Sequence, residues 1–389
     1  MEKNLIEDLR KSVEEITPWA VNLRRKFHSW PEVGNQEYRT TEWIKKELDA
    51  MSIPTKQPLN TGIIGLLEGD KDKTIALRAD IDGLPIQERI RLPFSSERQG
   101  FMHGCGHDVH IAVLLGTAKV LSEHKDKIKR SIKFIFQPAE ETTGGAERMI
   151  DAGCLKDPKV QSIYGFHVKP EIVAGKIGLK KGRVHACSDQ FTIRVQGMAS
   201  HGAYPDCGVD ALVSASQIVT NIQAIVSRNI SPLDSAVITI GSFHSGSGVN
   251  TIADRAILEG TIRSFDPMTR EHLRCRLKDT VEFTAKAAGA SAEVEFIKGY
   301  DALINHDEGV KEIADKAGYI LGPDSVIEIE SPSMGVEDFA YYLHKVPGAF
   351  FFLGSGYPYR ENPPLHSDSF QVNEACIQNG ILLLAGLCL

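Results

Sequence analysis

The chain has 389 residues, of which 42% are hydrophobic and 24% are charged, and its formal net charge is −7. This length allows two or three domains with a large core, and the composition is that of an ordinary globular protein. A negative charge without a basic stripe argues against nucleic acid as a partner. No apolar run in the sequence is long enough to span a membrane, so no membrane partner is expected.

The cysteines and the N-terminal segment indicate the compartment. Seven cysteines, an odd number, are scattered through the chain, which argues against a disulfide framework and for a reducing environment. The first ten residues contain no apolar core of the kind that a signal peptide has. We therefore expect a soluble cytoplasmic protein.

Two helices are expected before the first strands. Apolar residues recur at helical spacing between Leu5 and Ile16, and Pro18 should break or restart that helix. A second amphipathic segment covers residues 40–51, after a turn that contains proline and glycine.

Two carboxylates follow the second of two expected strands. The strands cover residues 62–68 and 74–79, and Asp80 and Asp82 come directly after the second one. Sites in open α/β sheets lie at the carboxyl ends of strands, so this pair is well placed for a site. A turn built by aspartate and glycine is the alternative.

The densest group of reactive side chains lies in residues 103–110, which hold three histidines, one cysteine and one aspartate. Cys105 and His107 have the short spacing of metal ligands, and the glycines beside the cysteine permit backbone angles that other residues avoid. An apolar run over residues 111–121 predicts a buried helix after this loop. A loop that opens onto a helix N-terminus favours anionic ligands, including a thiolate. The alternative is a core cysteine among surface histidines.

Two further strands lead to candidate ligands. Residues 131–137 form a short apolar strand followed by Glu140 and Glu141, and residues 162–167 form a strand that ends in His167. Adjacent glutamates point in different directions, so one can bind a metal while the other faces a substrate. An exposed pair without function is the alternative. Strands alternating with helices, with ligands at the strand ends, predict an α/β fold with a mostly parallel sheet and helices on both faces.

The pattern changes near residue 182, and an inserted domain is expected at residues 184–298. Its elements follow the order β-α-β-β-α-β of a ferredoxin-like α+β unit. The expected strands cover residues 190–196, 236–243, 256–264 and 291–297, and the expected helices cover 210–227 and 267–289. An antiparallel sheet that is open on one face could pair with another copy of the chain. Residues 1–183 and 299–389 then form the α/β domain.

The C-terminal segment resumes the α/β character. Residues 349–354 form an apolar strand, and residues 373–387 form a closing helix. Between them, a loop presents His366 shortly after two prolines, which stiffen its backbone.

Side chains from these segments form a candidate site of one thiolate, two carboxylates and three imidazoles. They are Cys105, Glu140, Glu141, His107, His167 and His366. Even without Glu140, five donors are too many for one tetrahedral catalytic zinc, and they suit two metal ions that share a bridging ligand. Such borderline-soft donors favour zinc, cobalt, nickel or manganese over magnesium or calcium. A glutamate within reach of a metal-bound water can take its proton and pass it to a leaving amine.

The sequence resembles the di-metal aminoacylase and carboxypeptidase-like family of metallopeptidases. More narrowly, it resembles the amidohydrolase branch of N-acyl-amino-acid amidohydrolases, hippurate hydrolases, auxin-conjugate hydrolases and N-acetyldiaminopimelate deacetylases. The match is collinear over nearly the whole chain. Its motifs are Ala79-Asp80-Ile81-Asp82-Gly83-Leu84-Pro85, His103-Gly104-Cys105-Gly106-His107-Asp108, Gln137-Pro138-Ala139-Glu140-Glu141, Gly165-Phe166-His167 and Pro364-Leu365-His366-Ser367.

The resemblance implies a role for each candidate in a di-metal catalytic domain formed by residues 1–183 and 299–389. Cys105 would bridge two divalent ions. The ligands that complete the two metal shells would be His107, Glu141, His167 and His366. Glu140 would act first as general base and then as general acid. Asp82 falls where the family places an aspartate that orients a ligand or the base.

For the inserted domain, the resemblance implies a lid that also makes the contact of a homodimer. His201 would approach the scissile carbonyl on closure as an oxyanion donor. Asn250 and Arg263 fall where the family contacts substrate, and an arginine suits a substrate carboxylate by bidentate pairing. The residues at positions 204–208 and 253–254 differ from those usual in this branch. Both segments lie in the expected lid, so the differences bear on the identity of the substrate more than on the catalytic chemistry.

We therefore expect a metal-dependent hydrolase that cleaves the amide bond of small N-acyl amino acids. A dipeptidase-like metallo-exopeptidase with the same metal machinery is the first alternative. A catalytically silent small-molecule binding protein on the same fold is the second, and an enzyme with Cys105 as nucleophile is the third. Ordinary core or surface roles are expected for His28, His124, His272 and His344, whereas the sequence leaves open the roles of His103, His110 and His185.

Overall fold

The computed structural model describes residues 2–389. The chain divides into two compact units, of which the first contains Met1–Gly182, Ile304–Ser331 and Asp338–Leu389, and the second contains Arg183–Leu303 and Pro332–Glu337. Within the second unit, the N–H of Ala186 donates to the carbonyl oxygens of Ser333 and Gly335, at 3.1 and 3.0 Å. None of the helices in residues 2–389 has both the length and the apolar character that crossing a bilayer needs.

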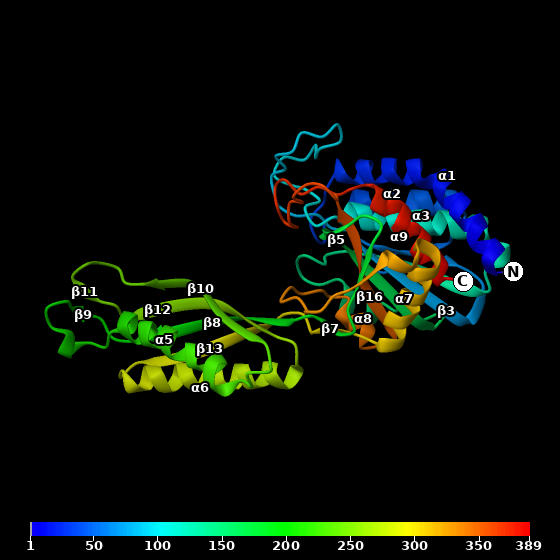
Figure 1. Ribbon diagram of the computed structural model, residues 1–389. Coiled ribbons are helices and arrows are strands. Elements are labelled where there is room, and N and C mark those ends of the chain that lie inside the picture. Colours follow the sequence, from blue (N-terminus) through cyan, green and yellow to red (C-terminus); the bar gives the residue numbers. More distant parts are fainter. Residues whose placement is uncertain (1) are drawn as a thin grey trace. The chain divides into compact units, whose positions relative to one another are not determined.

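An eight-stranded sheet lies at the centre of the first unit (Figure 1). Its spatial order is β1-β2-β4-β3-β5-β16-β6-β15, and neighbours in the series β4, β3, β5 and β16 run parallel. The strands are β1 (Thr55–Lys56), β2 (Ile63–Leu67), β3 (Asp70–Asp80), β4 (Arg130–Gln137), β5 (Val160–Val173), β6 (Ile177–Leu179), β15 (Val326–Glu328) and β16 (Gly348–Gly356). The antiparallel pairs are β1 with β2, β2 with β4, and β6 with β16. The prediction of a mostly parallel sheet is confirmed.

Helices cover both faces of this sheet. On one face, the stacked rings of Phe166 and Phe351 belong to an apolar cluster that the longer helices share, several of which are grouped in Figure 1. Those helices are α1 (Glu2–His28), α2 (Tyr38–Ala50), α3 (His107–Glu123), α7 (Asp307–Leu321) and α9 (Ala375–Leu387). Alternate residues of a strand point to opposite faces, so Phe350 packs on the other side, against Phe339 at the start of α8 (Ala340–Leu343). The short helix α4 (Ala146–Asp151) lies beside α8.

The predicted break at Pro18 was wrong, because α1 runs through that residue without interruption. Pro18 cannot donate to the carbonyl of Glu14, but both residues are exposed, so water can satisfy the free oxygen. Ile16 and Ala20 are buried on either side of the proline and anchor the helix to the core.

Two other elements near the candidate ligands extend beyond their predicted ends. β5 continues past His167 to Val173, so the prediction that this strand ends at the histidine was wrong. The buried helix predicted at residues 111–121 begins four residues earlier, at His107, and most of its side chains are buried. His107 therefore occupies the first turn of α3, directly after the glycine-flanked Cys105.

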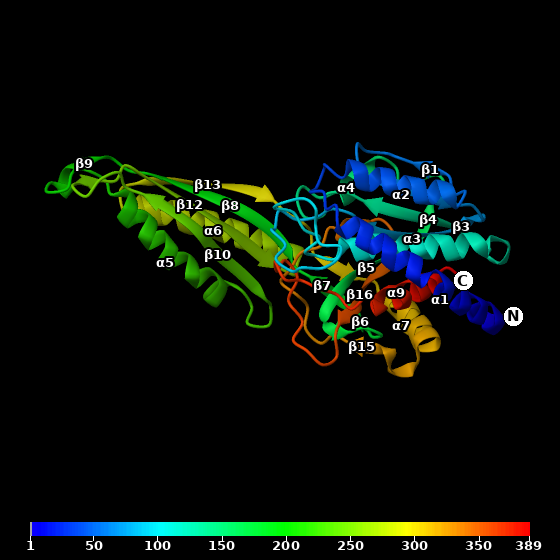
Figure 2. The ribbon, with the colours of Figure 1, turned by 90° about the horizontal axis from the view of Figure 1, so that it is seen from above.

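The second unit has the ferredoxin-like arrangement that the element order predicted. Its sheet has the order β10-β12-β8-β13 with antiparallel neighbours, and Figure 2 shows these strands side by side. The elements are β8 (Cys187–Gln196), α5 (Ala211–Asn229), β10 (Ala236–Ser245), β12 (Arg255–Ser264), α6 (Pro267–Ala287) and β13 (Ser291–Lys298). Asp210 and Asp266 cap the N-termini of α5 and α6 through their side chains.

Four short strands complete the chain. They are β7 (Gly182–His185), β9 (Ser200–His201), β11 (Thr251–Ile252) and β14 (Leu303–Asn305). β9 pairs with β11, which places His201 opposite Thr251 at one end of the second unit. β7 pairs with β14 where the chain enters and leaves the inserted segment.

Candidate metal centre

The expected ligands of the first unit lie near the carboxyl ends of its central parallel strands. Cys105 and His107 stand at the start of α3, and His167 lies on β5. Glu140 and Glu141 occupy the turn after β4, and a loop between β16 and α9 presents His366. These segments are separated by tens to hundreds of residues along the chain, and the parallel sheet is what brings them to one edge.

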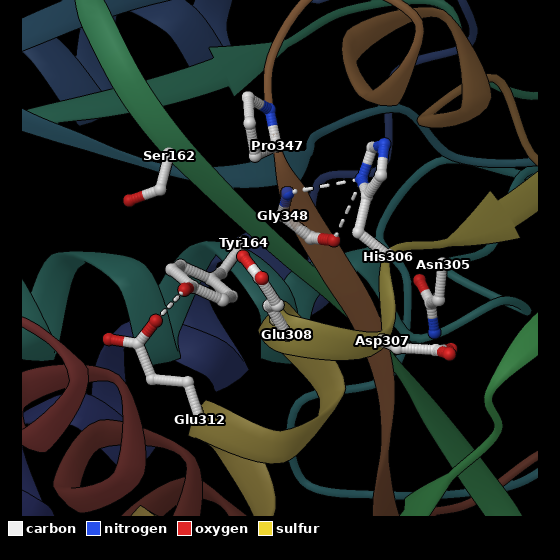
Figure 3. Close-up of a pocket in the computed structure, with 10 residues that line it drawn as sticks. Ser162, Tyr164, Asn305, His306, Asp307, Glu308, Glu312, Pro347 and Gly348 are labelled. Atoms are coloured by element: carbon white, nitrogen blue, oxygen red, sulfur yellow. Dashed lines mark hydrogen bonds between the residues drawn. The ribbon is translucent and has the colours of Figure 1, made fainter.

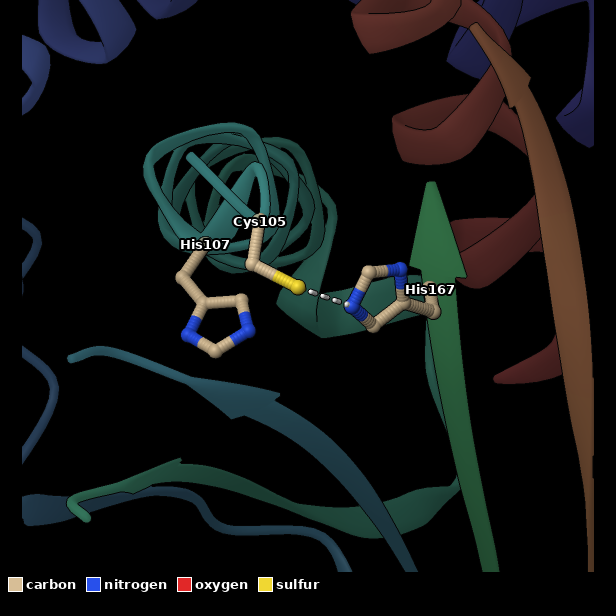
Figure 4. Close-up of side chains that lie close together, drawn as sticks. All are labelled: Cys105, His107 and His167. Carbon is tan, nitrogen blue, oxygen red and sulfur yellow. Dashed lines mark hydrogen bonds between the residues drawn. The ribbon is translucent and has the colours of Figure 1, made fainter. Parts of the chain in front are cut away.

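Cys105 is buried and lies between two imidazoles. Its Sγ atom is 3.2 Å from Nε2 of His167 and 3.3 Å from Nε2 of His366. Figure 4 shows the thiol directed at His167, with His107 beside it. Two imidazoles from distant parts of the sequence therefore converge on one sulfur atom.

Glu141 joins the remaining ligands to this group. Its Oε1 atom is 3.1 Å from Nε2 of His366 and 4.0 Å from Nε2 of His107. A ligand atom of Glu140 lies within 4.8 Å of ligand atoms of both His107 and Glu141. The structure thus brings together all five ligands expected from the sequence, with Glu140 next to them.

The carboxylate of Asp82 lies beside the ring of His107. Its Oδ1 atom is 3.3 Å from Nδ1 of His107, and its Oδ2 atom accepts a hydrogen bond from the backbone N–H of Glu141 at 3.0 Å. A carboxylate on Nδ1 leaves Nε2 of the imidazole directed into the cluster, as in many metal sites. Burial works against a charged His107, but the carboxylates of Asp80, Asp82 and Glu141 outweigh it and raise the pKa of His107 to about 10.

Unusual backbone conformations hold the ligand loops. Gly106 has a φ of 86°, and a Cβ atom there would lie 2.4 Å from Cγ2 of Val168, so this position requires glycine. Ala139, directly before Glu140, has a φ of 59°, and His366 has a φ of 63°. Non-glycine residues with positive φ are uncommon and tend to occur where the surrounding structure enforces a functional geometry.

The donor set fits divalent metal ions. Within residues 2–389, Nε2 of His107 and Oε1 of Glu141 are buried without a hydrogen-bond partner, and both point into the cluster. Burial, together with the charges of Glu141 and Glu140, raises the pKa of the Cys105 thiol well above its ordinary range. Sulfur, nitrogen and carboxylate donors gathered around buried negative charge are the ligands that zinc, manganese, cobalt and nickel accept. Metal ions would satisfy the unpaired atoms and balance the charge.

A buried ionic network behind the ligands was not anticipated from the sequence. Arg78 is fully buried on β3 and donates to Asp80 at 2.6 Å and to Asp338 at 2.8 Å. Gln137 donates to both carboxylate oxygens of Asp338, at 2.9 and 2.8 Å. A charged residue inside an apolar strand is a signal that could have revealed Arg78, whereas Asp338 sits in a loop without a distinctive pattern.

The histidines outside the expected ligand set have different surroundings. His28 is fully buried and lies 2.8 Å from Asp108 and 3.0 Å from Glu88. His103 is buried with neither ring nitrogen hydrogen-bonded to any described residue, and burial lowers its pKa to about 3. Among the described residues, neither belongs to a group of three or more donor atoms that lie within 4.8 Å of one another.

Of the three residues expected from the second unit, two lie together and one lies apart. His201 and Asn250 are neighbours, since the Asn250 amide is 3.0 Å from Nε2 of His201. Arg263 stands near the other end of β12, opposite Val237 on β10 and Ser188 on β8. Eight residues of extended strand between positions 255 and 263 span about 26 Å, so Arg263 lies far from His201 and Asn250 within this unit.

A pocket in the first unit lies apart from the metal ligands. It has a volume of about 620 Å³ and is lined by residues near the amino ends of β5 and β16, including Tyr164 and Gly348 (Figure 3). The Tyr164 hydroxyl donates to Glu312, and the ring of His306 contacts the Gly348 backbone at 3.3 Å. These polar groups have partners within the protein, and we assign the pocket no role.

Known proteins resemble this chain over most of its length. The chain matches the model of Peptidase family M20/M25/M40 over residues 76–389. It is 38% identical over 359 residues to the N-acetyl-L-cysteine deacetylase of Bacillus subtilis (strain 168), which covers 92% of this chain and 84% of the relative. It is 37% identical over 390 residues to thermostable carboxypeptidase 1 of Saccharolobus solfataricus, which covers 97% of each.

A solved structure resembles the chain as closely. The Bacillus subtilis YXEP protein, a dinuclear metal binding peptidase from the M20 family, has a TM-score of 0.84 and 33% identity, covering 96% of this chain and 98% of that one. This chain therefore shares the fold of that protein over nearly its whole length.

The buried carboxyl group of Glu37 makes the stability of the fold depend on pH. It is buried, and its Oε1 atom accepts from the N–H of Ala139 at 2.7 Å. Burial and the charge of Asp82 raise the pKa of Glu37 to about 7. A carboxyl with a raised folded-state pKa stabilises the fold below its unfolded pKa of 4.5, and this contribution is lost as the pH rises through 7.

We expect Glu37→Gln to remove this loss, because glutamine stays neutral and can still accept from Ala139. The free energy of unfolding of Glu37→Gln relative to the wild type should increase by up to about 3 kcal/mol between pH 5 and pH 8, since each unit of pKa corresponds to about 1.4 kcal/mol. Thermal unfolding of both metal-free proteins across this range measures it. A difference in melting temperature that is the same at both ends of the range would contradict the prediction.

Proposed function

This chain belongs to Peptidase family M20/M25/M40, and from that membership we propose that it hydrolyses the amide bond of N-acyl amino acids. The products are a carboxylic acid and a free amino acid. That the chain is a metal-dependent hydrolase of amide bonds follows from its family and relatives, and the substrate class is the proposed part. The observation that supports it best is the convergence of three imidazoles and two carboxylates around one buried cysteine, in a chain related to a deacetylase of an N-acetyl amino acid.

We propose that Cys105 bridges two divalent metal ions. The other ligands in this proposal are His107, Glu141, His167 and His366. The position of the thiol between His167 and His366, and of Glu141 between His366 and His107, supports a pair of sites that share a ligand. When bound, such ions polarise a carbonyl and make water a nucleophile near neutral pH. Manganese, zinc, cobalt and nickel all suit these donors.

Glu140 is the proposed proton carrier. It is buried beside His107 and Glu141, on a turn whose backbone Glu37 holds at Ala139. A carboxylate in this position takes a proton from the attacking water and returns it to the leaving nitrogen. Asp82 orients His107 and, through its bond to the Glu141 N–H, the same turn.

His201 is the proposed oxyanion donor. Its Nδ1 atom accepts a hydrogen bond from the Ala203 N–H at 3.1 Å, which leaves Nε2, 3.0 Å from the Asn250 amide nitrogen, as the ring atom that would donate to an oxyanion. Asn250 lies beside it and would contact the same part of the substrate. Arg263 would bind the substrate carboxylate by bidentate pairing.

The separation of these groups favours a homodimer. Arg263 and His201 are too far apart within one unit, roughly 25 Å along β12, to contact one small acyl amino acid. In a two-fold dimer formed through the second unit, His201 and Asn250 of one chain could serve the metal centre of the other. The open face and edges of the antiparallel sheet offer such a contact.

Three other functions would use the same fold. The similarity to a carboxypeptidase favours a metallo-exopeptidase as second candidate, with the same metal ligands but a peptide substrate. A thiol enzyme is disfavoured, since the raised pKa of Cys105 keeps the metal-free thiol protonated and weakly nucleophilic. A silent binding protein would not need Glu140 beside an intact ligand set.

A substrate panel on metal-reconstituted protein tests the proposed function. Exhaustive chelation should abolish activity, and manganese, cobalt, zinc or nickel should restore it with up to two ions per chain. The restored enzyme should hydrolyse acetyl, benzoyl or indoleacetyl amino acids or N-acetyldiaminopimelate at higher kcat/KM than dipeptides. Preference for dipeptides would establish the exopeptidase. Tight binding without turnover of any amide would indicate the binding protein, and activity that survives chelation but not alkylation would indicate the thiol enzyme.

Two substitutions separate the proton carrier from the ligands. Glu140→Gln should keep the metal and the fold but lower kcat by about 10²–10⁴, the usual contribution of general acid–base catalysis. Cys105→Ala should lose metal as well as activity. Metal content by elemental analysis and single-substrate kinetics measure the two effects. More than about a tenth of wild-type turnover in Glu140→Gln would remove Glu140 from this role, and full metal content in Cys105→Ala would remove the bridge.

Mixed dimers test whether His201 acts across the subunit contact. Glu140→Gln and His201→Ala chains should each be inactive, and a mixed dimer should recover activity in the one site that has both native groups. Differently tagged subunits allow the mixed dimer to be purified and verified before assay. No recovery would place His201 in the site of its own chain, and a fully active His201→Ala protein would end the assignment.

A further inference from the structure

We propose that His110 is a positioning residue for the metal centre, which binds the backbone N–H of Val168 and, through the position of that residue, sets the ring of His167. The inference deepens the proposed function and rests on it, because it concerns the geometry of one proposed ligand. His110 lies one turn after His107 on α3, and the sequence left its role open.

Both ring nitrogens of His110 have partners, and the partners determine its tautomer. Nδ1 lies 2.5 Å from Oδ1 of Asp80, and Nε2 lies 3.0 Å from the backbone nitrogen of Val168. The Val168 N–H can only donate, so Nε2 must accept. The proton therefore lies on Nδ1 and is donated to the carboxylate of Asp80. His110 and Asp80 are fully buried, so no water competes for these bonds.

The residue whose N–H bonds to His110 also orients His167, through the carbonyl oxygen of its next peptide group. Nδ1 of His167 donates to the carbonyl oxygen of Val168 at 2.8 Å, which directs Nε2 toward Sγ of Cys105 at 3.2 Å. The rings of His110 and His167 also make an edge contact, with 4.7 Å between their centroids. The position of the His167 ring therefore depends on where His110 places the strand.

The anchor behind His110 is shared with the turn that presents the glutamates. Arg78 fixes Asp80 from one side and donates to Asp338 from the other. Asp338 in turn accepts from the backbone N–H groups of Gly145 and Ala146, at 2.9 and 3.0 Å, at the end of the segment that carries Glu140 and Glu141. One buried network thus sets two sides of the cluster relative to each other.

A third metal site is the competing interpretation of these residues. Ligand atoms of Asp80, His107 and His110 do lie within 4.8 Å of one another. However, both nitrogens of His110 are hydrogen-bonded, and Asp80 bonds to Arg78 through Oδ2 and to His110 through Oδ1. A metal ion here would have to break buried bonds that are already well formed. The contacts fit a positioning role instead.

Two substitutions each keep one of the two bonds of His110. Glutamine places its Oε1 atom where Nε2 of histidine stands, so His110→Gln can still accept from Val168. Asparagine places its Nδ2 atom where Nδ1 stands, so His110→Asn can still donate to Asp80 but leaves the Val168 N–H without its acceptor. A residue that only fills space would give similar effects in both variants.

We expect His110→Asn to weaken metal binding by about 10–100-fold and to lower kcat more than it raises KM, as is typical when the partner of a metal ligand is lost. His110→Gln should stay within a few-fold of the wild type in both. The absorption spectrum of the cobalt-loaded full-length protein gives a readout without substrate: its thiolate and ligand-field bands should shift in His110→Asn and not in His110→Gln. Equal changes in both variants, or none in His110→Asn, would overturn the proposal.

A measurement on the wild type covers the case in which a variant fails to fold. Nitrogen-15 labelling of histidine should show His110 as the neutral tautomer with its proton on Nδ1, in a proton signal shifted far downfield by the short bond to Asp80. A proton on Nε2 would overturn the proposal. Failure of the proposed function is distinguishable, because it would appear as a wild-type protein that binds no metal or hydrolyses no amide in the panel, whatever the state of His110.

Discussion

Buried negative charge at the carboxyl edge of the central strands is the constraint on which the first unit depends. Asp80, Asp82 and Asp338 are almost inaccessible to water, and a buried carboxylate is costly unless it is paired. Arg78 forms ion pairs with Asp80 and Asp338 inside the sheet. The imidazoles of His107 and His110 lie beside Asp82 and Asp80. The negative charge that these contacts leave unpaired lies where the proposed metal ligands gather. The charge that is costly to bury in the fold therefore favours the binding of a divalent cation.

The loops that carry candidate ligands at this edge have strained backbone angles that hydrogen bonds hold in place. Ala139 and His366 take positive φ angles, which costs free energy that the contacts of their loops must offset. Glu37 holds Ala139 by its N–H, and the N–H of His366 donates to the carbonyl of Gly104 at 2.9 Å. The two loops are thereby tied to the scaffold at the residues beside or at the candidate ligands, which limits how far those side chains can drift.

Three histidines within residues 103–110 show how one motif divides into different tasks. His107 lies beside Asp82 and within the cluster, His110 faces Asp80 and the Val168 N–H, and His103 is buried without a hydrogen bond to any described residue. Their spacing on the chain does not distinguish them. His103 precedes α3, whereas His107 and His110 lie on its first turn, and the direction of each side chain depends on the residues packed opposite it, which is a property of the packed structure.

The sequence by itself was sufficient for the fold class, the order of the elements in the ferredoxin-like sheet and its two helices, and the residues that converge on Cys105, but it did not reveal α7, α4, β6 or β15 of the first unit. Hydrophobic periodicity and strand-end ligands are local signals, and parallel strands bring such ends together. Only the tertiary structure could show that α1 continues through Pro18, that β5 passes His167, and that Arg78 joins Asp80 to Asp338 across 260 residues. These features depend on burial and on partners far away in the chain, and no local pattern of residues encodes them.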